Sequence, residues 1–345
     1  MELQSRRITA QDYEGAMELC VTNGWTDGLP VAIPTPERVQ AMLSAAGQEP
    51  AEQLAFIENR QVTVTAEKAA INAVMAGCRS DYMPVVVAAV KALADPLFGY
   101  HGPATSTGGA AIFMLINGPI AQRLDVNHEN NLFGPGWRAN ATIGRAIRLI
   151  MRNVIGTVPG ELDRACMGHA GKYTFCIAEN EAESPWQPFH TTRGFEPHQN
   201  AVTIFAAVAP HQFINRLSRT PEGVLNTACS HMRLSSGVGR AGRQTQYALV
   251  LAGEHMSIIG KAGWSREDVQ AYCFEHTRTS LADLKGLDVT GGEIRPGDEN
   301  EMKPLVETPQ DFLVIAAGGR AGVQGAFIPG WGSKSASEAV TKEIL

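Results

Sequence analysis

The most informative stretch of the chain is Gly134-Pro-Gly-Trp-Arg-Ala-Asn-Ala-Thr-Ile-Gly-Arg145, which leads into a predicted helix ending near Val154. Apolar side chains repeat at helical spacing on one side of this helix, at Ile143, Ile147, Ile150 and Val154. Arginines share the opposite side, at Arg145, Arg148 and Arg152. Because a helix with one apolar stripe lies against a core, this segment predicts a helix packed on other elements.

Strand and helix patterns alternate on both sides of this stretch. Helices are predicted over 9–19, 37–46, 67–78, 84–94, 142–154, 254–260 and 266–276. Strands are predicted over 61–65, 110–116, 173–178, 201–208, 247–251 and 312–316. Such alternation indicates an α/β fold with mixed sheets and helices packed on them. We expect residues 1–345 to form a single catalytic unit, or two intimately joined halves divided near residues 185–200.

Composition excludes several classes of protein. The 345 residues, 44% of them hydrophobic, are enough for a large core, and the net charge of −6 provides no basic surface for nucleic acid. The longest apolar runs are shorter than the roughly 20 residues that span a bilayer, so no membrane is expected. Six cysteines without disulfide spacing and no apolar signal segment predict a cytoplasmic protein. We expect a homo-oligomer.

The opening stretch also predicts an anion site, because a helix N-terminus has unpaired N–H groups and a partial positive charge. Its candidate substrate-binding residues are Gly134, Gly136, Arg138, Asn140, Thr142 and Arg145. Asn140 or Thr142 could cap the helix, and Arg138 could bind a carboxylate or phosphate. The alternative is a structural turn in which Arg138 pairs with an internal group. A second candidate anion loop, with Arg320, follows the strand over 312–316.

Polar residues at strand ends and helix starts are the candidates for acid/base chemistry. His101, Lys172, Glu67 and Glu179 are the candidate catalytic residues, and Asn117 and Asn180 are candidates for orienting a substrate. Lys172 and Glu179 belong to one short strand, whose alternative role is a salt-bridged edge. Glu67 opens an otherwise apolar helical stripe, where its alternative role is to favour the helix dipole.

Neither a cofactor nor a metal is predicted. The segment Gly237-Val-Gly-Arg-Ala-Gly242 matches the dinucleotide fingerprint, but a strand rather than a helix is predicted after it. No P-loop is present. Cys229 and His231 could offer two metal ligands, whereas zinc requires three or four.

Several segments together resemble a bacterial family related to the UGSC-motif (selenocysteine or cysteine) proteins. They are residues 23–30, 67–78, 134–145, 171–180, 254–268 and 327–332, and the likeness covers most of the chain. The resemblance implies shared motifs and no particular reaction. The chain has no Cys-Gly-Ser-Cys segment, the redox motif that gives those proteins their name.

The function we expect from the sequence is an enzyme that acts on a small substrate bearing a carboxylate or another anion. Its acid/base chemistry, as a lyase, hydratase or hydrolase, would need no organic cofactor. One alternative is a thiol-dependent redox or nucleophilic enzyme that works through Cys78 or Cys176. Another is a non-catalytic small-molecule-binding or partner subunit.

Overall fold

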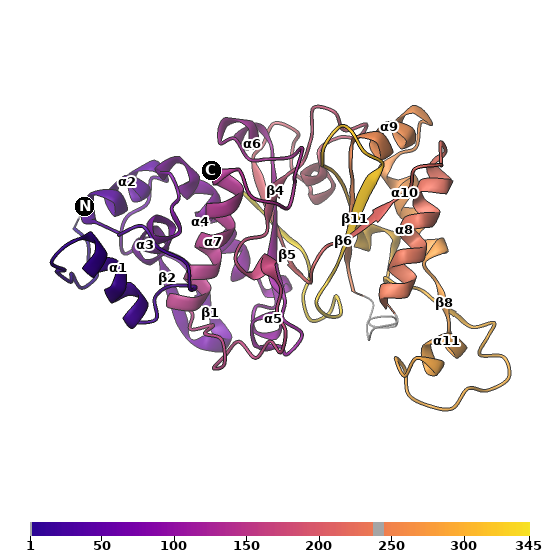
Figure 1. Cartoon of the computed structure of the whole chain (residues 1–345), viewed down its shortest axis with the longest axis horizontal. Helices are drawn as coiled ribbons and strands as arrows, with labels where there is room; N and C mark the ends of the chain where they lie inside the picture. Colours follow the sequence, from indigo (N-terminus) through magenta and orange to yellow (C-terminus); the bar gives the residue numbers. More distant parts are fainter. Residues whose placement is uncertain (1, 237–244) are drawn as a thin grey trace.

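Two four-stranded sheets lie face to face at the centre of the molecule, and helices cover the outer face of each (Figure 1). A computed structural model describes residues 2–236 and 245–345 of the chain. The layers run helix, sheet, sheet, helix. The fold is therefore α/β with mixed sheets, as the alternating patterns predicted.

Each sheet combines one parallel pair of strands with antiparallel ones. The first sheet has the order β12 (Val340–Glu343), β5 (Ala201–Ala207), β3 (Ala111–Asn117) and β4 (Cys176–Ala178). The second has the order β10 (Phe312–Ala316), β7 (Tyr247–Leu251), β11 (Gln324–Pro329) and β6 (His211–Ile214). The parallel pairs are β3 with β4 and β7 with β10, so β4 and β10 are edge strands.

The two sheets exchange strands. Strand β6 follows β5 along the chain but pairs with β11 in the second sheet. Strand β12 follows β11 but pairs with β5 in the first sheet. Because each sheet is completed by a strand from the other part of the chain, the two sheets form one folding unit. The expected division near residues 185–200 falls between β4 and β5 of the first sheet and stays a prediction.

The central strands are apolar on both faces. In β3, Phe113 and Leu115 face the second sheet, where Val250 and Ile315 belong to the same buried cluster. Met114, between them, packs toward the helices on the other side. Strands that are buried on both faces read as continuous apolar runs, and this is why β3, β7 and β10 were predictable.

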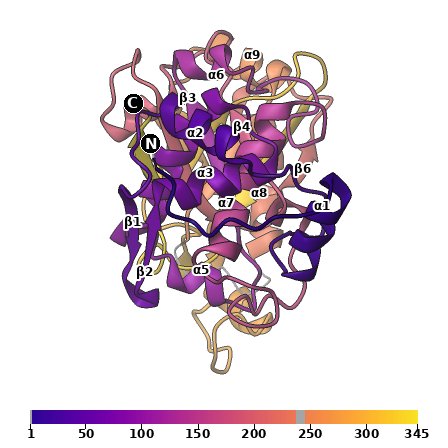
Figure 2. The same cartoon turned by 90° about the vertical axis from the view of Figure 1, so that its left-hand side faces the viewer.

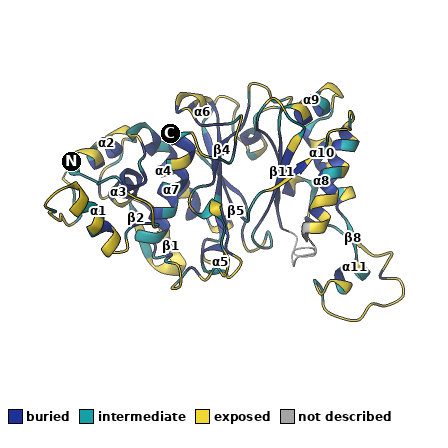
Figure 3. Cartoon of the chain, in the orientation of Figure 1, coloured by how far each residue is buried: buried dark blue, intermediate teal, exposed yellow. Residues whose placement is uncertain are grey.

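Helices cover the sheets from outside, and each turns a buried face inward (Figure 3). The first sheet is covered by α4 (Met83–Leu93) and α7 (Arg138–Asn153), and α3 (Ala66–Ala76) packs on these two helices from outside. The second is covered by α8 (Pro221–Ser236), α9 (Gly253–Lys261) and α10 (Arg266–His276). A capping box of Ser265 and Asp268 starts α10.

Shorter elements surround this framework. On the side of the first sheet lie α1 (Tyr13–Thr22), α2 (Pro36–Ala45), β1 (Gln53–Ile57) and β2 (Val62–Thr65) (Figure 1). The helices α5 (His101–Thr105) and α6 (Pro119–Arg123) flank β3. A projecting segment contains β8 (Thr279–Ser280), α11 (Leu281–Gly286) and β9 (Met302–Lys303). In residues 2–236 and 245–345, no helix has the length and apolarity needed to cross a membrane.

The start of α7 differs from the prediction. The helix begins at Arg138, four residues before Thr142, with Trp137 as an N-cap that makes no side-chain capping bond. Asn140 and Thr142 therefore lie inside the helix and do not cap it. Helix α8 was not predicted, and the fingerprint over 237–242 lies outside the described residues.

Close packing of α7 on β4 depends on Gly144. A Cβ atom at this position would lie 2.4 Å from Thr174 Oγ1 and 2.9 Å from the Phe175 backbone nitrogen. Thr174 cannot turn away freely, because its hydroxyl donates to the carbonyl of Asn140 at 2.6 Å. The glycine thus allows the helix to approach the sheet.

We predict that Gly144→Ala destabilises the protein by about 1–3 kcal/mol, because overpacking outweighs the gain of about 1 kcal/mol in helix propensity. Urea unfolding measures the effect. The matched control is Gly286→Ala in α11, where the nearest atom to the new Cβ is 3.8 Å away and no loss is expected. Equal stability of the two variants would contradict the packing argument.

Candidate functional site

The predicted site residues lie in four separate parts of the molecule. The stretch 134–145 spans the start of α7, Glu67 lies under the N-terminal arm (residues 3–10), and Lys172 lies beside a small cavity near α5. The fourth group brings Asn117, Glu179 and Asn180 together at the ends of β3 and β4. The first three groups have clear structural partners.

At the start of α7, Arg138 donates from Nε and Nη2 to the carbonyl of Gly77 at 3.0 and 2.9 Å. Gly77 is the C-cap of α3, so this guanidinium satisfies a carbonyl at a helix end. Asn140 is buried, and its amide donates to the carbonyl of Cys176 and accepts from the backbone N–H of Asn127. Thr142 donates its hydroxyl to the carbonyl of Arg138. Anion binding here stays a prediction.

The other predicted residues of this stretch, Arg145, Gly134 and Gly136, shape the loops around α7. Arg145 binds Asp27 through two hydrogen bonds of 2.8 Å and also donates to the carbonyl of Pro30, which holds the loop over 23–30. A Cβ atom at Gly134 would lie 2.1 Å from the Asn131 side chain, and Gly136 has a φ of +135°. These residues shape the approach to α7.

Glu67 holds the N-terminal arm. Its two carboxylate oxygens accept hydrogen bonds of 2.8 Å from the backbone N–H groups of Gln4 and Ser5. Burial alone would raise the pKa of Glu67, but the bonds from Ser5 and Gln4 bring that pKa below its ordinary value. Glu67 is therefore ionised at neutral pH and committed to the arm.

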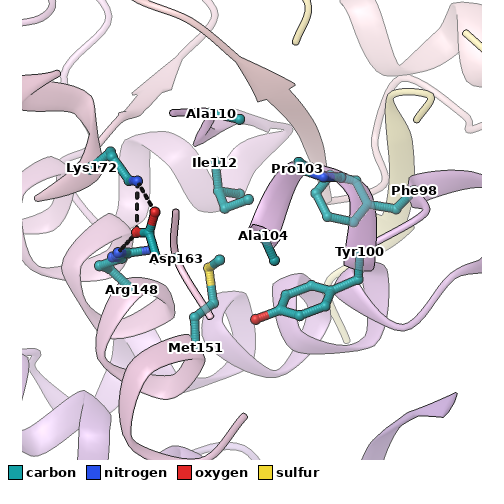
Figure 4. A pocket seen from close by; sticks show the side chains of 10 residues that line it. All are labelled: Phe98, Tyr100, Pro103, Ala104, Ala110, Ile112, Arg148, Met151, Asp163 and Lys172. Atoms are coloured by element: carbon teal, nitrogen blue, oxygen red, sulfur yellow. Dashed lines mark hydrogen bonds and ion pairs between the residues drawn. The ribbon is translucent and has the colours of Figure 1, made fainter. Parts of the chain in front are cut away.

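Lys172 shares Asp163 with Arg148 (Figure 4). Its Nζ donates to both carboxylate oxygens at 2.8 and 2.7 Å. Burial, together with Arg148, lowers the pKa of Lys172 despite Asp163. Lys172 lines two small cavities, one near α5 with a volume of about 0 Å³ and one of about 10 Å³, which is roughly the room of one water molecule, so no substrate fits in this conformation. His101 is exposed at the start of α5 and lines neither cavity.

The thiols expected for the alternative chemistry are buried. Burial raises the pKa of Cys78 to about 12 and raises the pKa of Cys176 well above its ordinary value. Because the thiolate is the reactive form, neither environment favours thiol chemistry. Among the described residues, no group of three His, Cys, Asp or Glu side chains is arranged to hold a metal. Cys229 and His231 therefore have no third ligand beside them in the described part of the chain.

The fourth group lies where the two sheets meet, and we call it the strand-end site: Asn117, Glu179, Asn180, Glu181 and Arg266. The backbone N–H of Asn180, just after β4, donates to the carbonyl of Ala316 at the end of β10 at 2.7 Å. The carboxyl ends of both parallel pairs therefore come together, and α6 and α9 follow β3 and β7 at the same end of the molecule (Figure 1). Ligands of α/β proteins commonly bind beyond the carboxyl ends of strands.

Glu179 is fully buried in this site, with a side-chain exposure of 0%. One oxygen accepts from Arg266 Nη2 at 3.1 Å. The other accepts from Asn117 Nδ2 at 2.6 Å and from the Phe189 backbone N–H at 2.5 Å. Burial raises the pKa of Glu179 to about 7, because loss of hydration outweighs the stabilisation of the carboxylate by these partners.

A second carboxyl shares a partner with Glu179. Asn117 Nδ2 also donates to Glu181 Oε1 at 2.8 Å, and the Gly118 backbone N–H donates to the same oxygen at 2.7 Å. Glu181 is half-buried, whereas Glu179 has no exposed side-chain area. The oxygen of the Asn117 amide is buried and accepts no hydrogen bond from the described residues.

The rim of the site carries exposed charges. Arg320, whose side chain is 71% exposed, pairs with Glu183 at 2.7 Å and with Glu129 at 3.4 Å. Asn180 Nδ2 donates to Glu183 at 3.1 Å. The second anion loop predicted from the sequence thus lies beside Asn180, one of the predicted residues just after β4.

Sequence reasoning did not include Glu181 and Arg266 among the site residues. A signal for Glu181 was present, because Glu179, Glu181 and Glu183 alternate directly after the strand. Arg266 comes from α10, and its proximity to Glu179 depends on the packing of the two sheets.

No protein-family model matches the chain, and a comparison with curated proteins also found no match.

We predict that Arg266→Met destabilises the protein by about 3–5 kcal/mol at pH 8.5, because it leaves the Glu179 charge buried without its cation. The loss should be smaller at pH 5.5. A carboxyl whose pKa is raised from its ordinary 4.5 to about 7 in the fold contributes stability below pH 4.5 that is lost as the pH rises through 7.

Urea unfolding at the two pH values measures this difference. The matched control is Arg278→Met, whose partner Glu275 has a side chain that is 60% exposed, so a loss below about 1 kcal/mol is expected at both pH values. A loss in Arg266→Met that is small, or equal at both pH values, would count against a buried carboxylate of this kind.

Proposed function

We propose that the protein is an enzyme that acts on a small carboxylate-bearing substrate by acid/base chemistry at the strand-end site. It would belong to the lyases, hydratases or hydrolases. The observation that supports the proposal best is the pair Glu179 and Glu181, which share the amide of Asn117 but differ in burial. Two neighbouring carboxyls in different environments are a common acid/base arrangement.

The two carboxyls take different roles in this proposal. Glu181 is half-buried and would contact the substrate and transfer the proton. Glu179 is a positioning residue that acts through Asn117, since it has no exposed area of its own. The unpartnered oxygen of Asn117 is an acceptor for a donor group of the substrate or for a water molecule.

The charges around the site narrow the substrate class. At the rim, Arg320 pairs with Glu129 and Glu183, while Arg266 pairs with Glu179, and Glu181 accepts only from the Asn117 amide and the Gly118 backbone N–H among the described residues. A substrate with only a carboxylate would be repelled by this excess of negative charge. A substrate with an amino group beside its carboxylate would find a partner for each of its charges. Arg320 would bind the carboxylate, and the glutamates would bind the ammonium. We therefore favour an amino acid or a close derivative.

The remaining parts of the proposal, on thiol chemistry, location, oligomeric state and cofactor, come from the sequence predictions. Thiol chemistry is the less favoured alternative, because Cys78 and Cys176 are buried with raised pKa values. All six cysteines are free, which agrees with the reducing cytoplasm that we propose as the location. A homo-oligomer stays part of the proposal, as does chemistry without an organic cofactor.

For a lyase or hydratase at this site, we predict exchange of a carbon-bound hydrogen of the substrate for deuterium in D₂O. Mass spectrometry over a panel of amino acids and simple carboxylates measures the exchange. Glu181→Gln should slow it by about 10²–10⁴-fold, the usual contribution of a general base. The control Glu161→Gln, an exposed glutamate outside the site, should exchange at the wild-type rate. Unchanged exchange in Glu181→Gln would refute the assignment.

Glu179→Gln tests the positioning role through the pH profile of kcat/KM. The wild type should show an inflection near pH 7, where Glu179 loses its proton. Because glutamine imitates the protonated carboxyl, the variant should keep at pH 8.5 the rate that the wild type has at pH 6. A variant that retains the inflection would assign it to another group.

A further inference from the structure

A groove of about 600 Å³ lies beneath the N-terminal arm. Its walls are the arm, α1, α2, α3 and the end of α7, and it shares no residue with the strand-end site. Figure 2 shows the arm crossing in front of α3 and α7 on its way to α1. The volume lies within the range of about 300–1,000 Å³ that is typical of small-molecule sites.

The walls of the groove are mainly apolar. Trp25, Ile71 and Val154 line it, are only partly buried, and pack against the main core behind them. Met75 and Val39, which are buried, complete this surface from α3 and α2. Apolar surface left open to water favours an apolar occupant, since its burial contributes roughly 25 cal/mol per Å².

The charges of the lining are mainly positive. Arg6, Arg7 and Lys68 line the groove, and none of them forms an ion pair with the described part of the chain. Glu67 is the acidic residue of the lining, but both of its oxygens are used by the backbone of the arm. Arg7 also acts at longer range on Glu37, outside the lining. The groove therefore presents cationic side chains beside an apolar floor.

The arm forms one wall and carries two of these cations. Because Glu67 fixes the backbone at Gln4 and Ser5, Arg6 and Arg7 follow directly from an anchored point. Lys68 faces the groove from the first turn of α3. A ligand with one anionic group could contact side chains from both walls.

We infer that the groove is a binding site for a small molecule with an apolar body and a carboxylate head, such as a medium-chain fatty acid. The apolar body lies along α3 and the end of α7, and the carboxylate lies near Lys68, Arg6 and Arg7. This site is separate from the strand-end site and does not depend on acid/base catalysis. The cationic lining distinguishes this groove from the strand-end site, whose rim carries Glu129 and Glu183.

Isothermal titration calorimetry with octanoate, octanol and octylamine tests the inference on the full chain. Octanoate should bind one site per chain, octanol at least fivefold more weakly, and octylamine not measurably. Lys68→Ala should weaken octanoate binding at least fivefold and leave octanol binding unchanged. The control Lys91→Ala removes an exposed lysine of α4 outside the groove and should bind as the wild type does.

In Lys68→Ala, Arg6 or Arg7 could still bind the carboxylate, so a second variant tests the apolar part of the groove. Ile71→Trp should fill the groove and abolish binding of both octanoate and octanol, while circular dichroism and thermal unfolding confirm the fold. Failure of octanoate to bind the wild type would overturn the inference, as would equal binding of the three compounds or wild-type binding by Ile71→Trp. Loss of deuterium exchange at the strand-end site would not affect any of these outcomes.

Discussion

The buried ion pair between Glu179 and Arg266 is the interaction on which the arrangement of the two sheets depends. It joins the end of β4 to α10, which covers the second sheet. Arg266 also donates to the carbonyl of Val314 in β10 and lies over the rings of Trp186 and Phe189. A buried pair of this kind adds little net stability, because desolvation offsets its attraction, but removing one partner is strongly destabilising. Its consequence here is to fix where the carboxyl ends of the strands meet.

The exchange of strands between the sheets makes this meeting point rigid. Strand β6 crosses into the second sheet and β12 returns to the first, so neither sheet can be completed without the other half of the chain. The apolar layer between them, from Phe113 to Ile315, is continuous. Such a framework can hold polar groups in a defined geometry at its edge, and Asn117 and Glu179 are held in this way.

Much of the fold was predictable because its central elements carry strong local signals. The bounds of β7, β10 and α10 agree with the sequence pattern, since two are continuous apolar runs and the third has a capping box. The start of α7 was misplaced because residues of the type that caps helices, such as Asn140, here bond to distant backbone groups. Strands β6, β11 and β12 of the two main sheets were missed. Few residues of β6 and β12 are buried, and β11 is a central strand that starts just after the glycine-rich segment over 318–322.

The candidate site could be predicted only in part. Asn117, Glu179 and Asn180 follow strands, and the ends of neighbouring parallel strands meet in space. Arg145 and Lys172 have partners, Asp27 and Asp163, that no local pattern connects to them. Arg266 is 87 positions from Glu179, and only the packing of the two sheets brings them together. Sequence patterns therefore indicate which residues end strands, while tertiary packing decides which of them share a site.

The most direct test of this account is the titration of the Glu179 carboxyl itself. Carbon-13 NMR of protein labelled at glutamate, with Glu179→Gln to assign the signal, would follow its protonation. We predict that the Glu179 carboxyl titrates near pH 7, well above its ordinary value, because the effect of burial on its pKa outweighs that of its hydrogen-bond partners. A Glu179 that stays ionised down to pH 4 would contradict this prediction, since its protonation would then not change near pH 7 and could not act on the site through Asn117.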